Sequence, residues 1–135
     1  MTQAGVKAVR ADRVGAREFV TQARIFVNDA ASPGLANESR QLLLHQASLT
    51  ACDAVLLAAG WTVGSGDGAH ALRLDKALAE LPGADDELFD RLDASRARRN
   101  EASYRAQAVP TASVSEATEA PLELLALVDA FLEQR

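Results

Sequence analysis

Apolar residues recur at helical spacing along most of the chain. Over residues 12–31 they fall at steps of three and four, which predicts an amphipathic helix; they are Val14, Ala16, Phe19, Val20, Ala23, Phe26, Val27 and Ala30. This helix should end at Ser32-Pro33-Gly34, because proline restricts the residue before it and glycine permits a left-handed backbone. No strand-like alternation of four or more residues occurs in the chain.

A second helix should begin near Asn37, whose side chain can cap it. From Arg40 to Ala59 the chain is apolar on more than one side, a pattern typical of a helix that is packed on several faces. We expect it to be the central helix of a bundle. Gly60 should end it, and the segment 61–68, WTVGSGDG, should be a glycine-rich loop outside regular structure.

Two shorter helices are expected next. Residues 69–81 should form a helix that ends at Pro82-Gly83, with its apolar side facing inward: Leu72, Leu74, Ala77, Leu78 and Leu81. Asp85 and Asp86 should open another helix, since carboxylates complement the positive end of a helix. Its inward face carries Leu88, Phe89, Leu92 and Ser95, and it leads directly into residues 96–104.

A last helix should span the apolar stripe that ends at Leu132. Ser113 and Glu116 have the spacing of a capping box, and Pro121 should kink or restart the helix because proline removes a helix hydrogen bond. The sequence therefore predicts an all-α fold, a bundle of about five helices with short connections. Residues 1–135 should form a single domain, in which 1–11 are a flexible N-terminal segment.

Composition narrows the class of protein. The chain has 135 residues, of which 48% are hydrophobic, 4% aromatic and 24% charged, as in a soluble domain with an aliphatic core. Its net charge of −5 argues against broad nonspecific DNA binding, which requires many phosphate contacts from Lys and Arg. The single cysteine, Cys52, cannot form an internal disulfide, and no zinc-ligand spacing is present, which fits a reducing cytoplasm.

Membrane insertion and secretion are not expected. The N-terminal segment has no apolar stretch of the signal-peptide kind, and no apolar run approaches the roughly 20 residues that cross a bilayer. No cofactor is indicated either. The glycines at 64, 66 and 68 precede a helix, but the lysine and hydroxyl of a phosphate-binding P-loop are absent. We interpret them as a joint between two helices, with Asp67 or Gly68 at the helix cap.

The two histidines differ in their surroundings. His45 lies within the most apolar helix, where a hydrogen-bonded core histidine is the usual explanation. His70 begins a helix beside the glycines, where an exposed accessory role in a site is open to it.

Residues 96–104, RARRNEASY, concentrate positive charge in an acidic chain. On a helix, Arg96, Arg99 and Ser103 lie in one row, and Asn100 and Tyr104 lie in the next. Guanidinium groups bind phosphate in a bidentate fork, and a tyrosine can stack on a base. The alternative is a solvated helix face on which Arg96 and Arg98 form ion pairs with Asp93 and Glu101 while Tyr104 packs in the core.

The order of elements resembles the HEPN domains of prokaryotes. A long apolar helix, a Gly-rich loop ending in GxGxH, a short helix, a helix closing in RxRRNxxxY and a last apolar helix span residues 15–135. Many HEPN domains carry Arg, a polar residue, three variable positions and His, and act as metal-independent endoribonucleases. Arg99 and Asn100 match the first two positions, but Tyr104 stands in place of the histidine.

The resemblance implies a homodimer that places two motifs across a shared cleft, with a minimal nucleotidyltransferase as a separately encoded partner. Because tyrosine titrates near 10 and histidine near neutral pH, we expect binding of RNA or a nucleotide with catalysis impaired or absent. One alternative is a toxin–antitoxin endoribonuclease with Arg99, Asn100 and Tyr104 as catalytic residues and His70 as an accessory. Another is a protein-interaction module without a nucleic-acid role.

Overall fold

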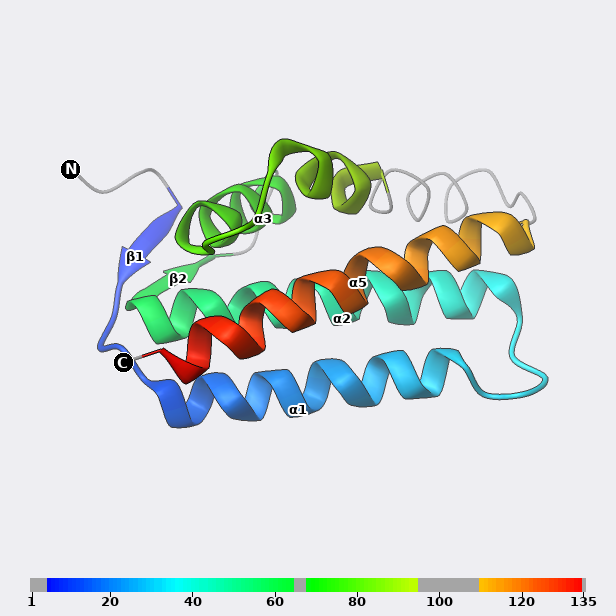
Figure 1. The fold of residues 1–135 in the computed structure, drawn as a ribbon, viewed down its shortest axis with the longest axis horizontal. Coiled ribbons are helices and arrows are strands. Elements are labelled where there is room, and N and C mark those ends of the chain that lie inside the picture. Colours follow the sequence, from blue (N-terminus) through cyan, green and yellow to red (C-terminus); the bar gives the residue numbers. More distant parts are fainter. Residues whose placement is uncertain (1–4, 65–67, 95–109, 135) are drawn as a thin grey trace.

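A computed structural model describes residues 5–64, 68–94 and 110–134 (Figure 1). Within these ranges the elements in chain order are β1 (Val6–Ala8), α1 (Arg13–Ala30), α2 (Asn37–Ala59), β2 (Trp61–Val63), α3 (Ala69–Glu80), a helix described over 86–94, and α5 (Thr111–Glu133). The described chain is thus an all-α bundle of five helices with one small sheet, which confirms the predicted fold class.

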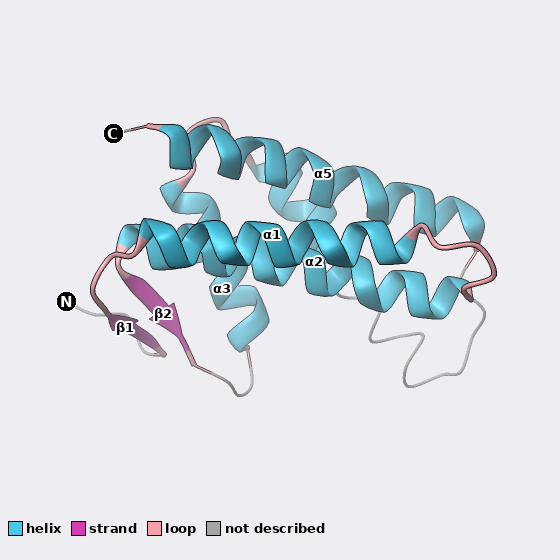
Figure 2. Ribbon diagram, turned by 90° about the horizontal axis from the view of Figure 1, so that it is seen from below, coloured by secondary structure: helices cyan, strands magenta, loops and turns pink. Residues whose placement is uncertain are grey.

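The central helix is α2, as predicted. It contacts α1, α3 and α5, and Figures 1 and 2 show α1 and α5 running along it while α3 crosses its other side. Its most buried hydrophobic side chains are Leu44, Ala47, Ala51, Cys52, Ala54, Val55 and Leu56, each at most 1% exposed. Alanines on several faces allow the neighbouring helices to pack closely, so the absence of a polar face in the sequence reflects burial on several sides.

By length and composition alone, α2 could cross a membrane. The expectation that no apolar segment is long enough is therefore wrong for this helix. Most of its apolar stretch, 61%, is buried inside the bundle. This burial is consistent with the core helix of a soluble protein, since a membrane-spanning helix meets lipid along its sides.

The ends of α1 and α2 follow the local chemistry of the chain at Asp12 and Gly60, but not at Asn37. Asp12 caps α1 by accepting a hydrogen bond from the Gly15 amide on Oδ1, at 2.8 Å. Gly60 ends α2 in the left-handed region at φ 90°, as predicted. The expected cap by Asn37 is wrong, because Ala36 occupies the cap position and Asn37 is already helical. Its side-chain Nδ2 instead donates to Thr111 Oγ1, at 3.4 Å.

The segment after Gly60 was expected to lie outside regular structure, and this is wrong for Trp61–Val63. These residues pair antiparallel with β1, with Val6 opposite Val63 and Ala8 opposite Trp61. Both valines are buried. Three residues are too few to show an alternating pattern, and their partner strand lies far away in the sequence. That partner lies within residues 1–11, of which the structure describes 5–11.

The last helix, α5, begins earlier and runs longer than predicted. Pro110 occupies its cap position in extended backbone, so Ser113 is not the cap of a capping box. The helix passes through Pro121 without a restart, and Pro121 is buried. Its C-terminal end is held by α1, because Arg13 Nη2 donates to the carbonyl of Leu132 at 2.9 Å and Arg17 Nη2 donates to the same oxygen at 3.1 Å.

Candidate functional site

The predicted phosphate-binding residues lie outside the described part of the chain. They are Arg96, Arg99, Asn100, Ser103 and Tyr104. The helix that leads into them is described over 86–94. Asp85 caps it, as predicted, with Oδ1 accepting from the Leu88 amide at 2.9 Å. Leu88 and Leu92 are 2% and 3% exposed, so this helix is anchored to the core immediately before the arginine motif.

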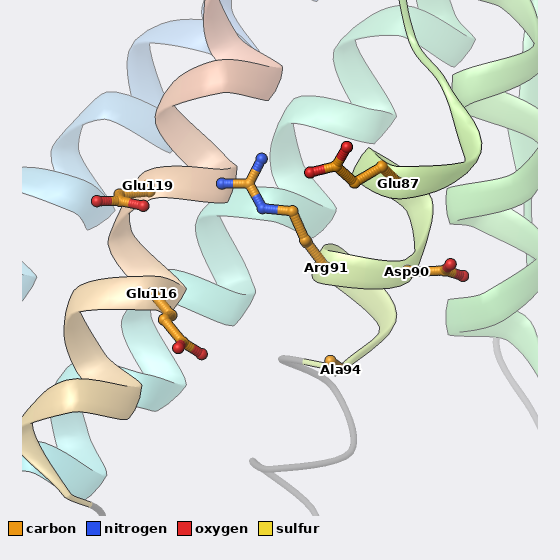
Figure 3. Close-up of a pocket in the computed structure, with 6 residues that line it drawn as sticks. All are labelled: Glu87, Asp90, Arg91, Ala94, Glu116 and Glu119. Atoms are coloured by element: carbon orange, nitrogen blue, oxygen red, sulfur yellow. The ribbon is translucent and has the colours of Figure 1, made fainter.

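A hollow of about 420 Å³ lies between this helix and α5 (Figure 3). We call it the acidic hollow; the described residues that line it are Glu87, Asp90, Arg91, Ala94, Glu116 and Glu119. Figure 3 shows the guanidinium of Arg91 extending from its own helix toward α5. There it forms an ion pair with Glu123, and this hydrogen bond, together with neighbouring carboxylates, raises the pKa of Arg91.

The charge of the acidic hollow determines what it can bind. Four of its six described lining residues are carboxylates, against one arginine that is already paired. Carboxylates repel a phosphate and attract cations. The described wall therefore contributes nothing to phosphate binding, and a phosphate ligand would depend on the arginines of residues 96–104. The same carboxylates would suit arginine side chains as partners, although the ion-pair alternative in the sequence names Asp93 and Glu101 instead.

The second predicted feature, His70, lies within the described residues and is only partly exposed. It is half-buried in the first turn of α3, after Gly68 at the cap position, one of the two residues expected there. The ring of His70 lies 5.6 Å from that of His45, with the planes inclined by 52°. His45 is 5% exposed, which confirms that it is a core histidine. A contact between these two histidines thus joins α2 to α3.

A small cavity adjoins the histidine pair. Its volume is about 10 Å³, and His45, Cys52, His70 and Leu92 are among the residues that line it. A cavity of this size holds at most one water molecule. An RNA nucleotide cannot enter it, so His70 has no substrate space on the side that faces His45. Within the described residues, no three His, Cys, Asp or Glu side chains are grouped as metal ligands would be.

A charged pair that the sequence pattern did not reveal joins α2 to α3. Arg73 Nε of α3 is 2.8 Å from Asp53 Oδ1 of α2. Burial raises the pKa of Asp53, although the nearby guanidinium acts in the opposite direction. An aspartate inside the apolar run of α2 was the available signal, because an isolated charge is rarely buried without a partner. The partner could not be identified from spacing.

This pair forms part of a second hollow, of about 400 Å³. We call it the Trp61 hollow; its walls include Phe19 of α1, Asp53 and Leu57 of α2, Trp61 of β2 and Arg73 of α3. Lys76 Nζ lies 4.4 Å from the centroid of the Trp61 ring. The hollow therefore combines aromatic walls with one ion pair.

Comparison of the chain with protein-family models, curated proteins and solved structures gave no significant match.

Proposed function

We propose that the chain is a HEPN-type helical domain that binds RNA or a nucleotide through Arg96, Arg99, Asn100, Ser103 and Tyr104, with catalysis impaired or absent. The observation that carries the proposal is the motif R-x-R-R-N-x3-Y directly after a helix anchored in the bundle core. The all-α fold and the element order on either side of the motif support it. The protein acts in the cytoplasm as a homodimer, and a nucleotidyltransferase encoded separately is its partner.

The proposed chemistry is phosphate recognition without a strong proton-transfer group. The arginines hold phosphate by bidentate hydrogen bonds, and Asn100 and Ser103 add neutral hydrogen bonds. Tyr104 stacks on a base. Its phenol remains protonated near neutral pH, so it is a poor substitute for a histidine in cleavage. No metal or cofactor has a role in this scheme.

The endoribonuclease alternative requires proton transfer by Tyr104 or His70, with Arg99 and Asn100 orienting the scissile phosphate. On the side that faces His45, His70 lines a cavity of about 10 Å³, which has no space for a nucleotide. This alternative therefore depends on Tyr104 or on the side of the His70 ring that faces away from His45.

The interaction-module alternative has one specific observation in its favour. The acidic hollow offers Glu87, Asp90, Glu116 and Glu119 beside the chain that leads into the arginines. If the arginines form ion pairs with these carboxylates, they are not available for phosphate. This alternative therefore predicts no RNA affinity and a weak energetic coupling between an arginine and a carboxylate of the hollow, well below about 1 kcal/mol for an exposed pair.

The deciding experiment measures the affinity of labelled single-stranded RNA by fluorescence anisotropy at two salt concentrations. Wild type should bind, and Arg99→Lys should bind more weakly because an ammonium lacks the planar fork. Arg99→Ala, which also removes the charge, should make the salt slope shallower by about 0.7. Tyr104→Phe tests the hydroxyl separately from stacking. Arg91→Lys is the matched control, because Arg91 lies in the helix that precedes the motif and is paired with Glu123. The affinity of this variant for RNA should equal that of wild type.

Several outcomes would contradict the proposal. No RNA binding by wild type, or equal affinities and slopes in wild type and Arg99→Lys, would return the motif to the ion-pair explanation. Cleavage of the RNA in EDTA that is abolished by Arg99→Ala would establish the endoribonuclease instead. A monomer in sedimentation at tens of micromolar would count against the homodimer and its shared cleft.

A further inference from the structure

The Trp61 hollow has the features of a small-molecule site, and its described walls share no residue with those of the acidic hollow. Its volume, about 400 Å³, lies within the range of ligand pockets, which combine apolar and aromatic walls with a few polar groups. Four elements converge on it: α1, α2, α3 and β2. The antiparallel pairing of β1 with β2 fixes the position of Trp61, because Ala8 is its partner in the register.

The aromatic walls come from Phe19 and Trp61. Phe19 is 37% exposed although it is a large apolar residue. Trp61 is only partly buried and packs against the core. The Lys76 ammonium lies over the indole ring and is 3.6 Å from Glu80 Oε1, so its charge is locally offset. These two rings leave aromatic surface accessible where a planar ring can pack.

Of the two ionic groups that line the hollow, the carboxylate is the more exposed. The side chain of Arg73 is 15% exposed, whereas that of Asp53 is 35% exposed. Arg73 already directs Nε at Asp53 and donates from Nη2 to the Val63 carbonyl, at 3.3 Å. A carboxylate has about four lone-pair positions, and the contact with Arg73 uses one oxygen, Oδ1. Asp53 therefore retains acceptor capacity and is the more exposed partner of the ion pair.

We propose that the Trp61 hollow binds a small planar aromatic molecule that carries an amidine-type pair of N–H donors, with Asp53 accepting from these donors and Phe19 and Trp61 packing on the ring. Charge complementarity selects a donor rather than an acceptor ligand, because the more exposed end of the ion pair is negative. Burial raises the pKa of Asp53 despite the presence of Arg73. A second cationic donor would stabilise the ionised carboxylate further.

The test uses two probes of the same shape and opposite charge, benzamidine and benzoate. Trp61 is the one tryptophan of the chain, so its emission and its indole N–H signal in an NMR spectrum report on this hollow alone. Benzamidine should shift both signals in a saturable manner, and benzoate should not. Asp53→Asn should weaken benzamidine binding by about tenfold or more, the range for a hydrogen bond to a charged group.

A second variant keeps the test decisive if Asp53→Asn does not fold. Phe19→Ala removes a partly exposed ring and should weaken benzamidine several-fold, whereas Ile25→Ala, at an exposed position of the same helix outside the hollow, should leave the affinity unchanged. Binding of benzoate in preference to benzamidine, equal binding of both, or no binding of either at millimolar concentration would overturn the proposal. These results are independent of RNA binding at residues 96–104, so either proposal can fail alone.

Discussion

The guanidinium of Arg40 in α2 holds the last residue of α1, with Nη1 donating to the Ala30 carbonyl oxygen at 2.6 Å. The same group donates from Nη2 to Ser32 at 2.9 Å and from Nε to Leu35 at 3.1 Å. One half-buried side chain therefore satisfies three carbonyl groups at the turn between the two helices. Such groups cost free energy when they are buried without a partner.

Substitution of Arg40 should destabilise the bundle. Arg40→Ala removes all three donors, and Arg40→Lys cannot reproduce the planar fork. We expect each to lower the free energy of unfolding by about 1–3 kcal/mol, with alanine the more damaging. Urea denaturation measures the change. Arg10→Lys, at an exposed position between β1 and α1, is the control, and an Arg40→Lys protein as stable as this control would show that the three hydrogen bonds contribute little.

Gly60 and Gly34 form a matched pair for testing the α2 C-terminus. Both have positive φ, 90° and 80°, so alanine is strained at either position. A Cβ at Gly60 would also lie 3.1 Å from the Val9 carbonyl oxygen, whereas one at Gly34 would have no atom within 4 Å. Gly34→Ala should therefore cost about 1–2 kcal/mol, and Gly60→Ala clearly more. Equal losses of stability in the two variants, measured by thermal or urea unfolding, would mean that the connection between β1 and α1 can move away from the added Cβ without a loss of free energy.

Cys52 should be chemically inert in the folded protein. Burial, reinforced by the neighbouring Asp53, raises the pKa of its thiol to about 12. At pH 8 only about one thiol in ten thousand would then be ionised, and the thiolate is the reactive form. Ellman's reagent should not react with native protein and should react with one equivalent in urea. Rapid reaction of the native protein would show that the Cys52 thiol is more accessible to the reagent than the 1% exposure of this residue implies.

Helix positions could be predicted from the sequence because the buried residues of a helix recur every three or four positions within one continuous segment. The apolar stripe of residues 12–31 and the αL glycine at position 60 act locally, and both predictions hold. The strand pair was missed because Trp61–Val63 is recognisable only beside Val6–Ala8. At Pro121 the restart that local rules allow does not occur, because this residue is buried in the core and α5 is continuous through it.

The candidate sites show the same difference between local features, which the sequence reveals, and contacts between elements, which it does not. On a helix, spacing predicts Arg99 and Asn100 in adjoining rows, but whether a phosphate or a carboxylate faces them depends on tertiary surroundings. The sequence also marks Asp53 as unusual within an apolar run, yet its pairing with Arg73 depends on how α3 crosses α2. Residue types can therefore be found in advance, whereas the partners that determine their chemistry come from the fold.

The ionisation of Asp53 should make part of the stability depend on pH. Burial raises its pKa above the ordinary value of 3.8, against the opposing effect of Arg73. The folded state then binds the proton more tightly than the unfolded chain. Asp53 therefore makes its full contribution to stability below the pKa that it has in the unfolded chain. This contribution is lost as the pH rises through the pKa that Asp53 has in the folded protein. Asparagine at this position cannot ionise, so the stability of wild type relative to Asp53→Asn should fall as the pH rises from about 3 to 6.

Urea denaturation of both proteins at several pH values measures this difference, and the comparison cancels the titration of carboxylates that the two share. Asp86→Asn, at an exposed carboxylate, gives the response of an ordinary surface position. If the stability of wild type relative to Asp53→Asn instead rises with pH, the prediction is wrong. Such a rise would mean that the attraction to Arg73 exceeds the cost of burial, and that the pKa of Asp53 lies below its ordinary value.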